Sequence, residues 1–321
     1  MAGRPRSARL GLLVLAALLL WGALSLYNRQ QGPTGGWLRA AGLEERWADV
    51  DGLRLRYVRA GQGPPVVLLH GFSSSIFTWR HVLKALAREH DVLALDFPGF
   101  GGSQVPEQLS PLGLAGSVRT LVTQLGLRRP ALVGHSMGGA VALLLAADPE
   151  LGVSRLALLD AATFAMAAED RPGLVRLVGR PWVAALLEYL PLRRLSVYAG
   201  LREVFYDDSL VTTEVLDEYV APLRRPGTTR ALARLLASGD AEARQLPERL
   251  AAVRVPTLVV WGRDDVWIPV THAERHARTL PGTRVVLLKR CGHMPQEEQP
   301  QETLRLLSEF LRDGAASPAP D

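Results

Sequence analysis

Short runs of mostly apolar residues recur along the chain. Six of them have the length of a β-strand and lack the alternation of polar and apolar residues that a half-exposed strand shows. Continuous apolar strands are typical of a parallel sheet that is covered on both faces. The runs are Pro65–Leu69, Asp91–Leu95, Ala131–Val133, Arg155–Leu159, Thr257–Val260 and Arg284–Leu288.

The segments between these runs have the apolar spacing of helices. Ahead of the first run, Glu45–Val50 and Leu53–Arg59 have the pattern of strands, and Asp51-Gly52 between them is a strong signal for a type I′ hairpin. Strands that alternate with helices predict an α/β fold, with a mostly parallel central sheet and helices on both faces. The expected helices are Phe77–Glu89, Ser117–Leu125, residues 139 to about 147, Val270–Thr279 and Glu302–Leu311.

The alternation is interrupted between residues 164 and 250. This segment has no strand signal, is rich in Leu, Ala and Arg, and is punctuated by Pro and Gly. We therefore expect a helical cap, inserted into a discontinuous core of residues 45–163 and 251–313. The cap would cover the carboxyl edge of the sheet, where open α/β sheets bind their ligands. Residues 314–321, mostly Gly, Ala, Ser and Pro, predict a disordered tail.

The N-terminal segment is apolar from residue 10 to residue 27, with one serine, and three arginines precede it. Its length is at the lower limit for crossing a bilayer, and the preceding positive charge favours the cytoplasmic side. These features predict a signal anchor over residues 1–27 and a linker over residues 28–44, with the rest of the chain outside the cytoplasm. A cleaved signal peptide, which would give a secreted protein, is the alternative, although the apolar run ends without a good cleavage site.

Composition narrows the classes of function. Of the 321 residues 48% are hydrophobic, which is ample for one large core. The formal net charge of +5 comes without a dense basic stripe, so nucleic-acid binding is not expected. Cys291 is the single cysteine, which excludes an intrachain disulfide, and we expect it to be a small apolar residue next to the catalytic loop, with a reactive thiol as the alternative.

The segment Gly134-His135-Ser136-Met137-Gly138 has the pattern G-x-S-x-G. It lies where the apolar run at Ala131 meets a stretch of small, helix-compatible residues. This context is typical of a nucleophile elbow, a sharp strand-to-helix turn that presents a serine hydroxyl at the end of the sheet. Ser136 is therefore the expected nucleophile. Because a serine needs a base within hydrogen-bond reach, a histidine and an acid should follow at later strand ends.

His293 follows the last expected strand and is the expected base. Asp265, which follows the strand before it, is the expected acid that orients the imidazole. Spacing alone does not separate Asp265 from its neighbour Asp264, and Asp160, at the end of an earlier strand, is a third candidate. Four other histidines lie on or beside expected helices, where we expect them to face solvent: His81, His90, His272 and His276.

An oxyanion hole requires two backbone N–H donors that point at the same oxygen. Met137, directly after Ser136, is expected to supply one of them. Phe72 is expected to supply the other, from the turn His70-Gly71-Phe72 that follows an apolar strand.

Together these motifs resemble the α/β-hydrolase fold superfamily. The resemblance covers about Glu45 to Leu311 and includes the order of Ser136, Asp265 and His293 in the chain. It implies that the acid is the third residue after the glycine of Gly262-x-x-Asp265, which favours Asp265 over Asp264. Other segments that look like family signatures are His70-Gly71-Phe72 and Asp96-Phe97-Pro98-Gly99-Phe100-Gly101.

Within the superfamily the chain looks most like esterases, lipases and monoacylglycerol lipases, of which one branch carries an N-terminal anchor. The resemblance implies hydrolysis of a carboxylic ester, of lipid or monoacylglycerol type, through an acyl-enzyme and without a metal or organic cofactor. The same residues leave open an acyltransferase, a perhydrolase or a carbon–carbon bond hydrolase, and a non-catalytic binding module is a further alternative. The expected partners are a small-molecule ester and, through the N-terminal segment, a membrane.

Overall fold

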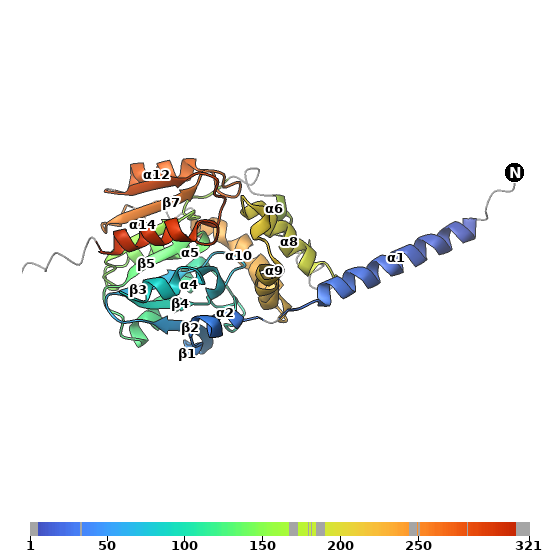
Figure 1. The fold of residues 1–321 in the computed structure, drawn as a ribbon, viewed down its shortest axis with the longest axis horizontal. Coiled ribbons are helices and arrows are strands. Elements are labelled where there is room, and N and C mark those ends of the chain that lie inside the picture. The colour runs from blue at the N-terminus through green and yellow to red at the C-terminus, as the bar shows by residue number, and fades with distance from the viewer. Residues whose placement is uncertain are drawn as a thin grey trace, which may run out of the picture.

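The computed structural model describes residues 6–32, 34–166, 173–178, 180, 182–183, 190–243, 249, 251–280 and 282–312. An eight-stranded sheet lies at its centre, in the order β1-β2-β4-β3-β5-β6-β7-β8 (Figure 1). Only β2 runs against the other strands, because it pairs antiparallel with β1 and β4 while all remaining pairs are parallel. The predicted α/β fold with a mostly parallel sheet is confirmed.

The apolar pattern of the sequence predicted the positions of most strands correctly. The ranges of β3, β4, β6 and β8 match the expectation residue for residue, and the turn between β1 and β2 has the positive φ of a type I′ hairpin at both Asp51 (55°) and Gly52 (80°). The strands are β1 Arg46–Val50, β2 Leu53–Ala60, β3 Pro65–Leu69, β4 Asp91–Leu95, β5 Ala131–His135, β6 Arg155–Leu159, β7 Thr257–Gly262 and β8 Arg284–Leu288.

Helices cover both faces of the sheet, and each layer has its own apolar core. Side chains of α4 (Pro111–Gln124), α5 (Met137–Ala146) and α12 (Thr271–Thr279) pack on one face. Side chains of α3 (Leu83–Leu86) and α14 (Pro300–Arg312) pack on the other. Burial of this apolar surface stabilises the three layers of helices, sheet and helices, and holds the carboxyl ends of the parallel strands at one edge.

One local prediction was wrong. The helix expected over Phe77–Glu89 is a 3-10 turn, η1 (Ile76–Trp79), followed by the single-turn α3. The backbone N–H of Ile76 donates instead to the buried Asp96 carboxylate (2.7 Å), a tertiary contact that apolar spacing does not reveal. The linker expected over residues 28–44 contains a short helix, α2 (Gly36–Ala41).

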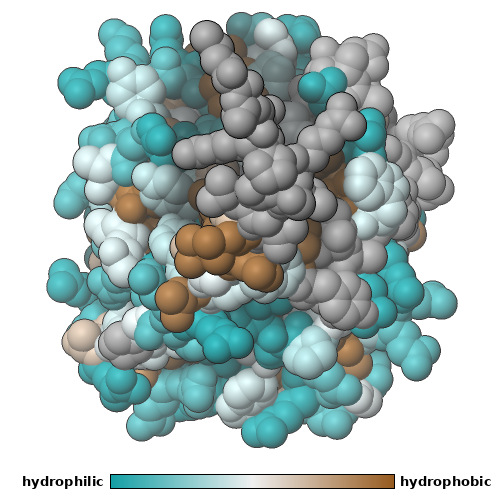
Figure 2. Space-filling model, turned by 90° about the vertical axis from the view of Figure 1, so that its right-hand side faces the viewer, coloured by the Kyte–Doolittle hydropathy of each residue, from teal (hydrophilic) through white to brown (hydrophobic). Residues whose placement is uncertain are grey.

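The first helix, α1 (Arg6–Arg29), projects away from the domain and meets it at α8 (Figure 1). Side chains are described from Leu15 onward, and hydrophobic side chains gather at the middle of the face from which α1 projects (Figure 2). Within the described part of the chain, no helix is both long and apolar enough to cross a membrane. The membrane-spanning segment predicted over residues 1–27 is therefore not supported there. The exposed large side chains of α1 include Leu15, Leu18, Leu19, Leu20, Trp21 and Leu26.

Between β6 and β7 every described element is a helix, in the segment that we call the cap (residues 164–250). Its boundaries stay predictions, and residues 314–321 lie outside the described residues. The cap elements are α6 (Gly173–Val178), α8 (Arg193–Val204), η3 (Asp208–Leu210), α9 (Thr213–Val220), η4 (Ala221–Arg224) and α10 (Thr228–Ala243).

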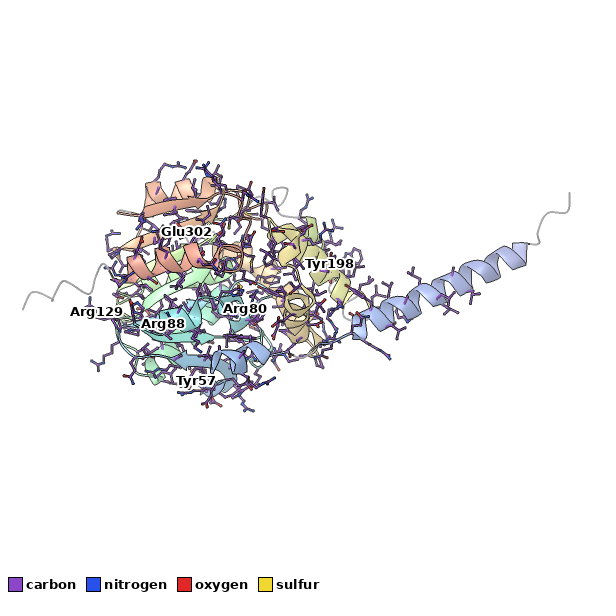
Figure 3. All side chains as sticks on the ribbon, viewed as in Figure 1. Tyr57, Arg80, Arg88, Arg129, Tyr198 and Glu302 are labelled. Carbon is purple, nitrogen blue, oxygen red and sulfur yellow. The ribbon has the colours of Figure 1, made fainter. Side chains whose placement is uncertain are left out.

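A buried polar contact joins the cap to the core. The Tyr219 hydroxyl of α9 donates to Glu297 Oε1, which also accepts from Thr78 Oγ1 at 2.6 Å. Arg80, on the side of the core toward the cap helices (Figure 3), pairs with Glu297 Oε2 at 2.6 Å. Charge-assisted hydrogen bonds of this kind fix the cap over the edge of the sheet.

Candidate active site

Ser136 lies at the turn from β5 into α5 in a strained conformation, with φ 51° and ψ −119°. A positive φ is rare for a residue with a side chain. The sheet imposes it, because the Ser136 N–H donates to the Leu159 carbonyl (2.9 Å) and the Ser136 carbonyl accepts from the Ala162 N–H (2.9 Å). Strain that the surroundings over-determine is a common mark of functional residues.

The flanking glycines of the elbow have a steric reason. A Cβ atom at Gly134 would lie 2.4 Å from the Gly138 carbonyl oxygen, and one at Gly138 would lie 2.2 Å from the Leu69 carbonyl oxygen. Both contacts are with backbone atoms, which cannot move aside. The pattern G-x-S-x-G thus results from close approach of the backbone on both sides of Ser136.

His293 and Asp265 form a buried pair. His293 Nδ1 lies 2.8 Å from Asp265 Oδ2, and the other carboxylate oxygen accepts from the N–H groups of Trp267 (2.7 Å) and Ile268 (3.0 Å). The carboxylate therefore accepts from Nδ1–H, a tautomer that leaves Nε2 able to take a proton. The neighbouring Asp264 is exposed, so the geometry separates two aspartates that spacing left equivalent.

The loop that carries His293 is held from several sides. Glu298, in the short helix α13 (Pro295–Glu298), accepts from the N–H groups of Gly292 (3.0 Å) and Met294 (3.1 Å). His135 Nε2 donates to the His293 carbonyl at 2.7 Å, and burial holds the pKa of His135 well below its usual value, so it stays neutral. Glu298 was missed in the sequence, since nothing distinguishes it from the neighbouring acidic residues before the loop is folded.

The two expected oxyanion donors flank the elbow. A Cβ atom at Gly71 would lie 3.1 Å from Ser136 Cβ, so the turn before Phe72 packs directly on the elbow. Met137 is the first residue of α5, where a helix leaves its N–H groups unpaired. In the described part of the chain no protein acceptor is recorded for the N–H of Phe72 or of Met137. Their role as an oxyanion hole stays a prediction.

Ser136 and His293 line one pocket under the cap. Phe72, His135 and Trp267 also lie at the wall of this pocket. Around Ser136 the lining is polar, whereas the cap contributes an apolar wall together with a few polar residues, Arg193, Ser196, Tyr219 and Thr229. The apolar wall comes from α8, η4 and α10 and consists of Val197, Leu201, Val204, Leu223, Leu232 and Leu236.

Residues 66–306 match the family model described as the alpha/beta hydrolase family. The chain belongs to this α/β-hydrolase family. This assignment agrees with the sheet order, the elbow and the helices on both faces. It also identifies the chain as an enzyme of the α/β-hydrolase type.

Relatives of this α/β-hydrolase differ in their chemistry. A soluble epoxide hydrolase of Corynebacterium sp. is 33% identical over 277 residues, which are 82% of this chain and 96% of that protein. The dihydrolipoyllysine-residue acetyltransferase component of an acetoin cleaving system from Cupriavidus necator is 35% identical over 273 residues, 83% of this chain and 68% of that protein. A solved bacterial membrane phospholipase A is similar with a TM-score of 0.69, at 27% identity over 98% of this chain and 100% of that chain.

Two expectations about this hydrolase's histidines were wrong. His90 and His276 are buried, whereas they were expected to face solvent. His276 Nε2 lies 2.7 Å from Thr163 Oγ1, and burial lowers the pKa of His276 to about 3. Both misjudged residues lie on or beside helices whose inner faces pack on the core. Cys291 is buried, and burial raises the pKa of its thiol, which disfavours the reactive thiol that was the alternative.

Proposed function

We propose that this α/β-hydrolase is a serine hydrolase that cleaves carboxylic esters. The observation that carries the proposal is the strained Ser136, which shares a pocket with His293, whose Nδ1 is held by the buried Asp265. A histidine that is fixed in one tautomer beside a serine is the arrangement that activates a hydroxyl at neutral pH.

In the proposed reaction His293 Nε2 takes the proton of the Ser136 hydroxyl while its oxygen attacks the ester carbonyl carbon. The N–H groups of Phe72 and Met137 stabilise the negative oxygen of the tetrahedral intermediate. The carbon–oxygen bond to the alcohol then breaks, and His293 gives its proton to the leaving alkoxide. Water attacks the acyl-enzyme with His293 as base again, and the acid is released.

The pocket supports an ester with a long apolar acyl part. Its cap wall is formed by leucine and valine side chains of α8 and α10, which would bury a hydrocarbon chain. Each buried methylene contributes about 0.8 kcal/mol of binding free energy. We therefore propose a lipid-like ester, such as a monoacylglycerol, as the substrate class. The membrane phospholipase A that matches along the whole chain supports a lipid substrate.

The relatives also suggest other reactions. Epoxide hydrolysis is the reaction of one relative, but the serine at the elbow and the histidine held in the same pocket favour the ester hydrolase. Transfer of the acyl group to an alcohol or to peroxide uses the same acyl-enzyme and is the second candidate. Its support is the acetyltransferase component among the relatives.

We further propose that the N-terminal segment brings the active site to a lipid surface outside the cytoplasm. The exposed leucines of α1, including Leu18, Leu19 and Leu26, support the contact with lipid, and the arginines before the apolar run support a position outside the cytoplasm. Contiguous apolar surface of this kind usually marks a contact with a lipid or a protein. Sedimentation of the full chain with lipid vesicles, compared with a chain lacking residues 1–27, tests it. Equal sedimentation of the two would overturn it.

The ester hydrolase proposal is tested with p-nitrophenyl esters and 1-acylglycerols of increasing acyl length. Wild type, Ser136→Ala and Ser196→Ala are compared, since Ser196 is a pocket serine away from the elbow. We expect kcat/KM to rise toward medium or long chains in wild type and Ser196→Ala, and to fall by about 10⁴ or more in Ser136→Ala. Turnover that survives in Ser136→Ala would overturn the proposal. Alkyl esters formed in added alcohol would favour the acyltransferase.

A further inference from the structure

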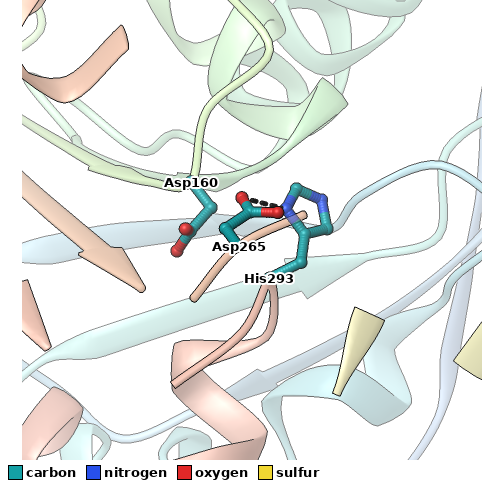
Figure 4. Close-up of side chains that lie close together, drawn as sticks. All are labelled: Asp160, Asp265 and His293. Carbon is teal, nitrogen blue, oxygen red and sulfur yellow. Dashed lines mark hydrogen bonds and ion pairs between the residues drawn. The ribbon is translucent and has the colours of Figure 1, made fainter. Parts of the chain in front are cut away.

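A second acidic side chain lies beside the Asp265–His293 pair. Asp160 follows β6 with a positive φ of 41° and is fully buried. One of its carboxyl oxygens, one of Asp265 and one imidazole nitrogen of His293 lie within 4.8 Å of one another (Figure 4). The three residues come from the ends of β6, β7 and β8, so the parallel sheet brings them together.

The two carboxyl groups differ in how they are stabilised. Asp265 accepts from two backbone N–H groups and from His293. Asp160 accepts one hydrogen bond, from the Gly262 N–H to Oδ1 (2.9 Å). No N–H or O–H group of the described residues donates to its buried Oδ2, and its side-chain hydrogen-bond partner is the neighbouring Asp265. The negative charge is therefore more stable on Asp265 than on Asp160.

The surroundings of Asp160 disfavour a second negative charge. The groups that face it are Asp265, Glu298 and His293, together with the buried Cys291. Burial, and then the charge of Asp265, raise the pKa of the Asp160 carboxyl well above its usual range. Two buried carboxyl groups side by side do not both ionise, because burial disfavours each charge and the two charges repel each other.

We propose that Asp160 is a neutral carboxylic acid and a positioning residue, whose proton on Oδ2 faces Asp265 and holds that carboxylate against His293. This inference rests on the proposed ester hydrolysis only where it is tested by kinetics. The three side chains also have donor types that bind metal ions, but the hydrogen bond between Asp265 and His293 already uses one atom of each.

The decisive variant is Asp160→Asn, which has the same shape. Its amide oxygen still accepts from the Gly262 N–H, so its NH₂ group faces Asp265 as the acid proton does. We expect kcat/KM within about threefold of wild type and no shift in the acidic limb of its pH profile, whereas Asp160→Ala lowers kcat more than about tenfold with little change in KM. If Asp160 is ionised, Asp160→Asn removes a negative charge near the base and moves that limb down by about one pH unit, which would overturn the proposal.

A stability measurement tests the protonation without any substrate. The unfolded chain releases the Asp160 proton above about pH 4, while the folded protein retains it. A raised folded pKa of an acid means that stability is complete below about pH 4 and decreases as the pH rises. Wild type should therefore lose stability relative to Asp160→Asn between pH 4 and 7, by up to about tenfold in the unfolding constant per pH unit.

Two outcomes separate this inference from the proposed function. A stability difference between wild type and Asp160→Asn that is constant with pH would overturn the neutral acid even if Ser136-dependent hydrolysis is found. A difference that grows with pH supports it even if no ester is hydrolysed. The infrared spectrum of the wild type at pH 7 should also contain the carbonyl band of an un-ionised carboxylic acid, and Asp160→Asn should lack it.

Discussion

Replacing Asp265 by asparagine should disable the enzyme through a tautomer rather than through loss of shape. The two backbone N–H groups of Trp267 and Ile268 both donate to Asp265 Oδ1 at 2.7 and 3.0 Å. They require an oxygen at that position in Asp265→Asn, so the NH₂ group must face His293. Two donors would then face each other across the 2.8 Å that now separates Nδ1 from Oδ2.

The imidazole can avoid this clash only by moving its proton from Nδ1 to Nε2. His293 would then accept from the asparagine amide, and its Nε2 could no longer take a proton from Ser136. For a serine triad this change lowers kcat by about 10⁴, which corresponds to about 5.5 kcal/mol of transition-state stabilisation. The fold should persist, because the backbone hydrogen bonds to Oδ1 remain.

The assay is kcat/KM for a p-nitrophenyl ester, together with the rate at which a fluorophosphonate labels Ser136. Asp264→Asn is the matched control, since Asp264 is the exposed neighbour, and its activity should stay within about twofold of wild type. Activity of Asp265→Asn within tenfold of wild type, or an equal loss in Asp264→Asn, would refute the assignment of the acid.

Three further outcomes are expected. Burial lowers the pKa of His276 to about 3, so the contribution of its neutral imidazole to folding stability is complete above about pH 6.5 and is lost as the pH falls. By pH 5 the free energy of unfolding of wild type should fall by about 2 kcal/mol relative to that of His276→Gln. An equal pH dependence of the two free energies would contradict this. Leu232→Trp, in the cap wall, should shift the preferred ester toward shorter acyl chains, while Leu195→Trp at an exposed site should leave the preference unchanged. Tyr219→Phe removes a buried donor to the α13 carboxylate and should lower the free energy of unfolding by about 2 kcal/mol, against less than about 0.5 kcal/mol for the exposed Tyr206→Phe.

The inner strands of the sheet could be predicted from sequence because they are buried on both faces. Pro65–Leu69 and Asp91–Leu95 are apolar runs between turn residues, and burial selects that pattern directly. The elbow could be predicted for a different reason. Gly134 and Gly138 approach backbone atoms too closely to bear a side chain. The turn therefore requires glycine at these two positions, and that requirement can be read from the sequence.

What the sequence missed depends on contacts between distant residues. Asp160 and Asp265 are 105 positions apart in the chain (265 − 160) and meet only because β6 and β7 are neighbours in the sheet. The burial of His276 depends on which side of α12 faces the core, and the hydrogen bond from Ile76 to Asp96 joins residues 20 positions apart at the start of η1.

The central claim is that Ser136 becomes acylated by an ester. Its most direct test mixes the enzyme rapidly with a p-nitrophenyl ester of medium chain length, stops the reaction with acid in the first turnovers, and measures the mass of the protein and of its peptides. We predict a mass increase of one acyl group, located on the peptide that contains Ser136 and absent in Ser136→Ala. Turnover without an acyl group on Ser136, or an acyl group on another residue, would contradict the account.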